Sequence, residues 1–394
     1  MQKKLSEILS LSQSLVRIPS ITVGAAERVD EVHRAAQLIY GYLKTNGLEV
    51  YCFDRERYPA ILAGFPGQIA TPVMLSGHFD VVAPEPDDSQ FEPRIEGDYL
   101  WGRGAADMKT VVATNLVWMK ETLQQGPPYP QVNLLLVGNE ENGEEDPMGT
   151  PYVLELLGKE KDYQPEIFIA GERTEETGRN LWGRICVENR GVGRFQVVAR
   201  GERIHSAAST VKDDLTLRLI RARVKLSELA TQHLTLDSTE GWKSQIRFPF
   251  VSIGTPGVYN ITPDYGALGV EIRSIPQDDI YGMMNAFEIY CKAHDLKIED
   301  LLLEPGVACD PANPWLIKLI EAVDETSGRE AVVGKKIHGT SARFAPGGNG
   351  VVWGQSGLDP HARDERHYIP SIEPYYRALE EFGRKTISNE QRCT

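Results

Sequence analysis

The sequence predicts an α/β fold in which helices flank a mostly parallel sheet and a smaller α/β domain is inserted. Four short apolar runs, each ending near a glycine, are typical of buried strands. They span residues 73–75, 133–138, 166–171 and 351–354. Between the third and fourth runs, apolar and polar residues alternate instead, as in strands with one open face. We therefore expect a main domain built from residues 1–186 and 304–394, with residues 187–303 inserted as a second domain.

Helices are expected between the strands, where apolar residues recur with helical spacing. In the main domain the expected helices span residues 5–16, 29–43, 112–123 and 151–157. Those expected in the insert span residues 209–234 and 280–291. The first three helices stop before Pro19, at Asn46-Gly47 and at Gly126, which are residues that end helices. Residues 84–97 are rich in proline and acidic residues and predict a loop over one edge of the sheet.

Side chains that can bind metals follow each of the four predicted strands. Parallel strands end at the same edge of a sheet, so these side chains should gather there, joined by an acidic residue from a glycine-punctuated loop. The residues are His78, Asp107, Glu140, Glu141, Glu172 and His361. Four carboxylates at one place would repel one another, and a cation between them removes that difficulty.

The ligand types indicate which cation this would be. Two histidines with three carboxylates fit zinc or a similar divalent ion, and so many ligands indicate two ions that share a bridging carboxylate. Glu140 would then be left over as the general base of a metal-assisted hydrolase. Asp80 stands two residues after His78, and a nearby carboxylate is how proteins orient an imidazole toward a metal.

The sequence resembles the zinc-dependent amidohydrolases and exopeptidases that include acetylornithine deacetylase, succinyl-diaminopimelate desuccinylase, aminoacylase and the bacterial glutamate carboxypeptidase. The resemblance covers essentially the whole chain, with the motifs in the expected order. They are Ser76-Gly77-His78-Phe79-Asp80, Gly102-Arg103-Gly104-Ala105-Ala106-Asp107-Met108-Lys109, Glu140-Glu141 and Gly171-Glu172. The resemblance implies a zinc-exopeptidase-like fold and the hydrolysis of amide bonds.

The resemblance also implies a role for each candidate residue. The implied ligands are His78, Asp107 and Glu172 for one zinc ion, and Asp107, Glu141 and His361 for the other. Asp107 would be the bridge, and cobalt or manganese could stand in place of zinc. Glu140, the first of the acidic pair, would be the base, and Asp80 would fix His78. Glu365, four residues after His361, would support that ligand by hydrogen bonding.

Residues outside the metal ligands would bind the substrate. The insert would act as a lid and as the surface of a homodimer. From it, His205 would complete the oxyanion site, and Asn260 and Arg273 would contact the substrate; an ordinary loop histidine, turn asparagine and strand arginine are the alternatives. Arg343 would bind the substrate's α-carboxylate, to which its bidentate geometry is suited. The family usually carries an aspartate in this loop that is absent here, so either Ser341 replaces it or the loop is one residue shorter.

Composition narrows the class of protein. The 394 residues carry a net charge of −14, which argues against nucleic acid or an anionic membrane as a partner. Five scattered cysteines without CxxC spacing predict neither a disulfide framework nor a cysteine zinc site. No stretch is long enough to span a membrane, and the amino terminus lacks an apolar core for export. We therefore expect a cytoplasmic protein with reduced thiols.

The expected function is that of a two-metal hydrolase that cleaves the amide bond of an N-acyl amino acid. This is the deacylase activity of the acetylornithine deacetylase and succinyl-diaminopimelate desuccinylase type, and the expected partner is a small-molecule substrate. A dipeptidase or carboxypeptidase that uses the same site is the alternative. A non-catalytic binding protein is a third hypothesis, which the intact Glu140 and the full ligand set disfavour.

Overall fold

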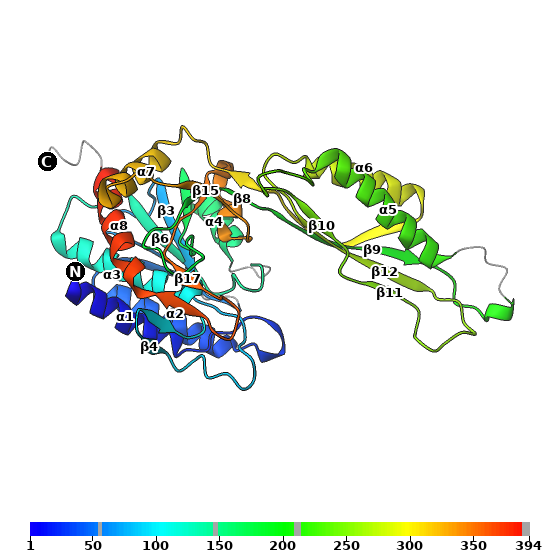
Figure 1. Cartoon of the computed structure of the whole chain (residues 1–394), viewed down its shortest axis with the longest axis horizontal. Helices are drawn as coiled ribbons and strands as arrows, with labels where there is room; N and C mark the ends of the chain where they lie inside the picture. Colours follow the sequence, from blue (N-terminus) through cyan, green and yellow to red (C-terminus); the bar gives the residue numbers. More distant parts are fainter. Residues whose placement is uncertain (54–56, 145–148, 209–213, 388–394) are drawn as a thin grey trace. The chain divides into compact units, whose positions relative to one another are not determined.

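The computed structural model describes residues 1–53, 57–144, 149–208 and 214–387. The chain forms two compact units, each drawn in Figure 1. The first unit contains Met1–Val187, Ala308–Lys336 and Thr340–Thr394, and the second contains Glu188–Val307 and Ile337–Gly339. Most of the second unit, Glu188–Val307, is therefore an insertion in the first, and the short segment Ile337–Gly339 is added to it.

The described residues form a nine-stranded sheet that is the centre of the first unit. Its strands are ordered β1-β2-β6-β3-β7-β16-β8-β14, and β15 pairs with β8. They are β1 (Glu49–Phe53), β2 (Ala60–Gly64), β3 (Val73–His78), β6 (Val132–Val137), β7 (Ile167–Ala170), β8 (Ile185–Asn189), β14 (Val307–Ala308), β15 (Val333–Lys336) and β16 (Gly350–Val352). The neighbours β6, β3, β7 and β16 run parallel, and they are the four strands predicted from apolar runs. The predicted mostly parallel sheet is thus confirmed.

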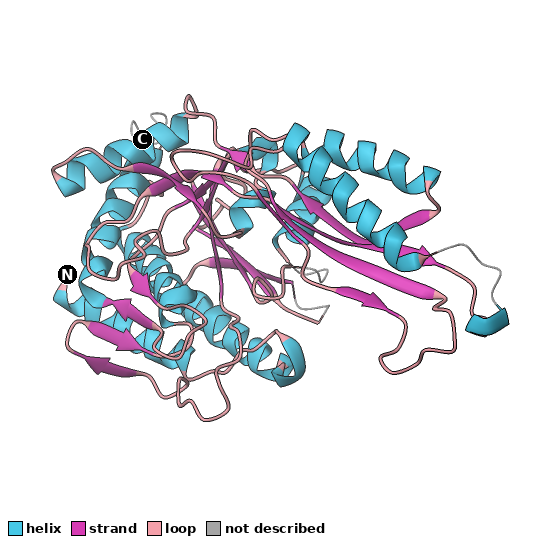
Figure 2. Ribbon diagram, turned by 45° about the vertical axis from the view of Figure 1, so that its right-hand side comes forward, coloured by secondary structure: helices cyan, strands magenta, loops and turns pink. Residues whose placement is uncertain are grey.

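Helices pack on both faces of this sheet (Figure 2). They are α1 (Gln2–Val16), α2 (Val29–Thr45), α3 (Thr110–Gln125), α4 (Thr150–Lys161), α7 (Pro314–Ser327) and α8 (Ile372–Thr386). Successive side chains of a strand point to opposite faces of its sheet, so both faces of a covered strand are apolar. Leu75 of β3 packs into a core that contains residues of α1, α2, α3, α7 and α8, whereas Met74 packs into one that contains residues of α4. Residues 73–75 can therefore be a continuous apolar run.

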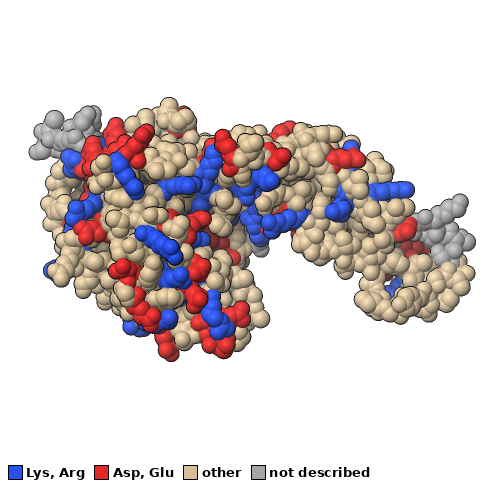
Figure 3. Space-filling view, in the orientation of Figure 1, with Lys and Arg blue, Asp and Glu red and all other residues tan. Residues whose placement is uncertain are grey.

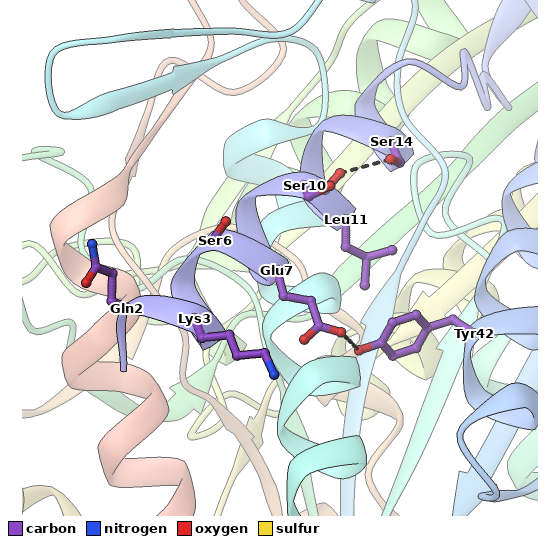
Figure 4. Close-up of a pocket in the computed structure, with 8 residues that line it drawn as sticks. All are labelled: Gln2, Lys3, Ser6, Glu7, Ser10, Leu11, Ser14 and Tyr42. Carbon is purple, nitrogen blue, oxygen red and sulfur yellow. Dashed lines mark hydrogen bonds between the residues drawn. The ribbon is translucent and has the colours of Figure 1, made fainter.

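Polar contacts join the helices on one side of the first unit. A surface groove along α1 is lined by seven residues of that helix and by Tyr42 of α2 (Figure 4). The Tyr42 hydroxyl donates to the Glu7 carboxylate at 2.8 Å, and Lys120 of α3 also contacts that carboxylate. Glu7 thus ties α1 to both neighbouring helices. On the face shown in Figure 3, acidic and basic side chains of the first unit are interspersed.

The second unit has a five-stranded antiparallel sheet among its described residues, with two helices on one face. The strands are β9 (Val192–Arg200), β10 (Gln245–Arg247), β11 (Val251–Ile253), β12 (Tyr265–Arg273) and β13 (Leu296–Glu304), and the helices are α5 (Leu215–His233) and α6 (Ile280–Ala293). Leu219 and Phe287 of the helices pack against Val197 and Val270 of the strands. Both helices and the strands β9 and β12 lie where helical spacing and alternation predicted them. Residues 209–213 of the expected first helix lie outside the described residues.

The structure also contains a small third sheet that the sequence patterns did not predict. It is ordered β17-β18-β5-β4, with β4 (Arg94–Glu96), β5 (Tyr99–Trp101), β17 (Gly357–Leu358) and β18 (Arg366–Tyr368). The prediction of a loop over residues 84–97 is therefore wrong at its end, because residues 94–96 pair with 99–101 in a hairpin. All three β4 residues are exposed, so this strand has no apolar alternation by which to recognise it. The sheet brings the segment before Asp107 beside the segment that carries His361.

Candidate active site

Three of the predicted ligands lie at the carboxyl end of the parallel strands. His78 is the last residue of β3, Glu141 lies four residues after β6, and Glu172 lies two residues after β7. His78 and Glu172 are buried, and the Glu141 side chain is only 6% exposed. Because β6, β3 and β7 are adjacent and parallel, their ends hold these side chains on one edge of the sheet.

Asp107 reaches the same place from a distorted helical turn, Ala105–Lys109. Gly104 begins the turn with a φ of 84°, a conformation that favours glycine. The Glu365 carboxylate accepts hydrogen bonds from the backbone N–H groups of Ala106 and Asp107 at 3.0 and 3.2 Å, and it forms a buried ion pair with Arg103. The expectation that Glu365 supports His361 is therefore not met. Its carboxylate points into the protein, where it holds the Asp107 turn.

The Asp107 carboxylate lies between the two predicted histidine ligands. Its Oδ1 is 3.2 Å from His78 Nε2, and its Oδ2 is 3.6 Å from His361 Nε2. The same His361 nitrogen is 3.0 Å from Glu141 Oε2. Asp107, Glu141 and His361 each offer a ligand atom, and these three atoms lie within 4.8 Å of one another. One carboxylate that offers each oxygen to a different histidine has the arrangement expected of a bridging ligand.

Asp80 holds two parts of the site together. It is fully buried, and its Oδ1 is 3.4 Å from His78 Nδ1. Its carboxylate also accepts from the backbone N–H groups of Glu140 and Glu141, at 3.1 and 2.9 Å, and from the Thr22 hydroxyl at 2.7 Å. Asp80 therefore orients the His78 ring and fixes the backbone that carries the acidic pair. No sequence signal pointed to Thr22.

The electrostatics of the cluster favour a bound cation. Burial raises the pKa of Glu140 and Glu141 well above the usual range, and the charges of Glu172 and Asp107, respectively, raise it further. Burial and the Asp107 charge also raise the pKa of Glu172. Burial acts on Asp107 in the same direction, but the hydrogen bond and charge of His78 outweigh it, and the Asp107 pKa is lowered. Divalent cations would relieve this repulsion, and nitrogen and carboxylate donors suit them. The residues present fit such ions.

Arg343 also reaches this centre. Its side chain is 4% exposed, with Nη1 4.0 Å from Glu140 Oε1, and Nη2 donates to the Gly143 carbonyl at 3.3 Å. The Ser341 hydroxyl donates to Glu144 Oε1 at 2.6 Å, and Glu144 is buried. Glu144 could not be recognised from the sequence, because a single glutamate in an acidic stretch gives no sign that it will be buried.

The remaining predicted residues, His205, Asn260 and Arg273, belong to the second unit. His205 and Asn260 come from neighbouring segments, since the N–H of Ser206 donates to the Asn260 carbonyl at 2.9 Å. Arg273, the last residue of β12, forms an ion pair with Glu271 at 2.8 Å. Their contact with a substrate stays a prediction.

Residues 74–385 match the model of peptidase family M20/M25/M40. The chain belongs to this family. A succinyl-diaminopimelate desuccinylase of Gluconobacter oxydans is 27% identical over 390 residues, which cover 94% of each chain. The resemblance drawn from the motifs is thereby confirmed, and the chain is a metal-dependent hydrolase that acts on amide bonds of small-molecule substrates.

Solved structures of the family share the fold. An M20 family metallo-carboxypeptidase from Sulfolobus solfataricus has a TM-score of 0.71 and 18% identity, and the alignment covers 96% of this chain and 98% of that one. A dinuclear metal-binding peptidase of the M20 family from Bacillus subtilis has a TM-score of 0.62 and 14% identity, with 99% and 100% covered. In the described part of this chain, no helix has the length and apolar character needed to cross a membrane.

Proposed function

We propose that this protein is a deacylase that hydrolyses the amide bond of N-acyl amino acids at a centre of two divalent ions. The observation that carries the proposal is the placement of Asp107 between His78 and His361, with Glu140 and Arg343 beside them. The named relatives that cleave a succinyl amide support the acyl amino acid as substrate. A dipeptidase or carboxypeptidase with the same centre is the alternative, which the carboxypeptidase fold relative keeps open.

The proposed ligands divide between two ions, which share Asp107. His78, Asp107 and Glu172 would hold one, and Asp107, Glu141 and His361 would hold the other. Zinc is the first choice, because histidine with carboxylate ligands suits it, and cobalt and manganese are the alternatives. When bound, such ions supply Lewis acidity, which acidifies water and polarises a carbonyl group.

The chain's own residues would then carry the proton and orient the substrate. Glu140 takes a proton from the attacking water, whose oxygen forms the new bond to the amide carbon. As the carbon–nitrogen bond breaks, Glu140 passes that proton to the leaving amine. Arg343, next to Glu140, binds the α-carboxylate of the same amino acid and so places its amine near the base.

We also propose that residues 1–186 and 304–394 form the catalytic domain, and that residues 187–303 act as a lid and as the surface of a homodimer. From the lid, His205 would complete the oxyanion site, and Asn260 and Arg273 would contact substrate. The exposed side chains of Leu217, Ile220 and Val224 on α5 support the dimer surface. Ile220→Glu should shift the protein from dimer to monomer in analytical ultracentrifugation, and an unchanged mass would contradict this surface.

We propose a cytoplasmic location because cysteines of this chain are reduced thiols. Three cysteines, Cys186, Cys291 and Cys309, are free thiols and are buried. Free thiols are the usual state in a reducing compartment.

The activity is tested by amine release across N-succinyl and N-acetyl amino acids and simple dipeptides, with metal-loaded protein. A chelated sample controls for metal dependence. Chelator-sensitive release from the acyl amino acids is the expected result. Release from dipeptides alone would replace the deacylase with the peptidase, and no release from any substrate, with ions bound, would overturn the proposal.

A further inference from the structure

His361 reaches the proposed centre from a loop, not from the end of a parallel strand. The loop joins β17 to β18, and 51% of the His361 side chain is exposed. Its backbone has a φ of 63°, in the left-handed region that residues other than glycine seldom adopt. Such a conformation persists only where the surrounding structure holds it.

The ring of His361 lacks the support that the ring of His78 has. Asp80 lies beside Nδ1 of His78, whereas the contacts of the His361 ring with described residues all use Nε2. Histidines that bind metals usually donate their second ring nitrogen to a partner, which fixes the direction of the ring. The direction of the His361 ring is therefore set by the backbone of its loop.

Gln90 binds that backbone directly after His361. It is 6% exposed, and its Nε2 donates to the Ala362 carbonyl at 2.9 Å and also to the Arg363 carbonyl. Both partners are acceptors, so the amide must present its NH₂ group, and both of its hydrogens are used. The Ala362 N–H donates to the Asp359 carbonyl at 3.1 Å, so Ala362 is held through both of its backbone polar groups.

A second donor converges on the same carbonyl. Nη2 of Arg103 donates to the Ala362 carbonyl at 3.3 Å, and the backbone N–H of Arg103 donates to the Gln90 carbonyl at 2.9 Å. Arg103 belongs to the glycine-punctuated segment that carries Asp107. Gln90 thus connects the loop of His361 to the segment of the proposed bridging ligand.

The other contact between these segments is at the surface. Asp87 and Arg363 form an ion pair at 2.5 Å, and both side chains are more than half exposed. Exposed ion pairs contribute little, because water and salt screen them. The hydrogen bonds of the buried Gln90 amide are therefore the stronger hold on the loop.

We infer that Gln90 is a positioning residue, which fixes the loop of His361 so that the imidazole meets the second ion together with Asp107 and Glu141. The inference rests on the proposed two-ion centre and adds to it a residue that binds no metal and no substrate. It concerns one ion only, since the first ion has two ligands, His78 and Glu172, that follow strands of the central sheet.

The test is a calorimetric titration of metal-free protein with zinc ion. Gln90→Met keeps the bulk of the side chain without its donors, and it should weaken one binding step about 10- to 100-fold and leave the other unchanged. Gln90→Glu, which has the same size and no donor, should weaken that step at least as much. Gln124→Met, the same change at an exposed glutamine of α3, should match wild type. Equal weakening of both steps, or of neither, would overturn the inference.

His361→Ala assigns the weakened step. It removes the ligand itself, so it should weaken the same step as Gln90→Met. In the double variant Gln90→Met should then weaken that step no further, because its effect passes through His361. A full additional loss in the double variant would contradict the inference, since Gln90 would then act on the ions by another route.

A readout without metal separates this inference from the proposed function. In chelated protein, hydrogen exchange of peptides that span residues 359–365 should be faster in Gln90→Met than in wild type and Gln124→Met. If two ions bind but no acyl amino acid is cleaved, the deacylase fails and the titration still decides on Gln90. If wild type does not bind two ions, the centre itself fails, and unchanged exchange in Gln90→Met would overturn the positioning role as well.

Discussion

Asp107 is the single residue on which the proposed centre depends most. Its two carboxylate oxygens face His78 and His361 separately, and Glu365 fixes the backbone from which it projects. The motif around it identified Asp107 in the sequence, but the motif did not show which residue would hold it. Glu365 lies four residues from His361 along the chain, so proximity in sequence suggested the wrong partner.

Loss of the bridge should release both ions. Asp107→Ala removes one ligand from each proposed site, so bound metal measured by elemental analysis should fall from two ions per chain to less than one. Asp30→Ala, on the exposed side of α2, is the matched control and should keep both ions. Full occupancy in Asp107→Ala would mean that the carboxylate does not bridge.

Residues whose role comes from burial alone could not be predicted. Glu144 is an ordinary glutamate in the sequence, and nothing near it indicates that it loses contact with water. His78, Glu141 and Glu172 could be predicted, because each follows a recognisable apolar strand and carries a side chain that is costly to place there without a purpose.

Two loops that come from distant parts of the chain are joined at the centre. The loop after β6 carries Glu140, Glu141 and Glu144, and the turn Ser341–Phe344 carries Arg343. The hydrogen bond from Ser341 to Glu144 connects them. The loop of Ser341 and Arg343 has no acidic residue of its own. Ser341 instead contacts an acidic residue of the other loop, Glu144.

Removal of this connection should loosen Arg343. Ser341→Ala takes a donor from a buried carboxylate, a change that costs about 1.5–3 kcal/mol of stability for a hydrogen bond to a charged group. We expect KM for carboxylate-bearing substrates to rise more than kcat falls. Ser227→Ala, at the surface of α5, is the control, and the idea fails if the two variants have the same KM.

Glu175 makes a second connection between elements, from the segment after β7 to the one after β16. Burial raises its pKa, but hydrogen bonds from Ser356, Thr177 and Asn180 outweigh this and lower the pKa to about 2, from an ordinary value of 4.5 for glutamate. The folded-state pKa is therefore depressed. The stability that Glu175 provides is present above about pH 4.5 and is lost as pH falls toward 2.

Glu175→Gln should accordingly flatten part of this acid response. Urea unfolding of chelated wild type and variant, between pH 6 and pH 2.5, should show a stability difference that shrinks as the pH falls. Chelation removes metal binding as a second cause. A constant difference across this range would show that the charge of Glu175 does not contribute.

Elements differ in how well the sequence predicts them. The four central strands are buried on both faces, so they appear as continuous apolar runs, and α3 and α6 show clear helical spacing. The hairpin of β4 and β5 consists of two strands of three residues each. Its β5 strand pairs with residues 366–368, which are also three residues and lie far away in the sequence. Strands this short have no periodicity to detect, so this sheet could not be predicted.

The whole molecule has two units, each with its own apolar core. The insert could be predicted, because the pattern changes from continuous apolar runs to alternation when a sheet has one open face. All five proposed metal ligands lie in the first unit, while His205, Asn260 and Arg273 lie in the second. Metal binding and substrate binding should thus respond differently to damage in the insert.

Phe287→Ala tests this separation. Phe287 is fully buried in the core of the second unit, and its truncation should cost that unit about 3–5 kcal/mol. Limited proteolysis should then cut within residues 188–307 faster than in wild type, while elemental analysis still finds two ions per chain. Loss of the ions from this variant would show that the centre depends on the insert.

The most direct test of the account is made with Glu140→Gln, on which metal content and turnover are measured in the same sample. The substitution keeps the size of the side chain but cannot accept the proton, and loss of general base catalysis costs about 10²–10⁴-fold in rate. We predict two ions per chain, as in wild type, and a kcat lower by that factor on the best acyl amino acid. Loss of an ion would mean that Glu140 is a ligand and Glu141 the base, and wild-type turnover with both ions bound would contradict the mechanism.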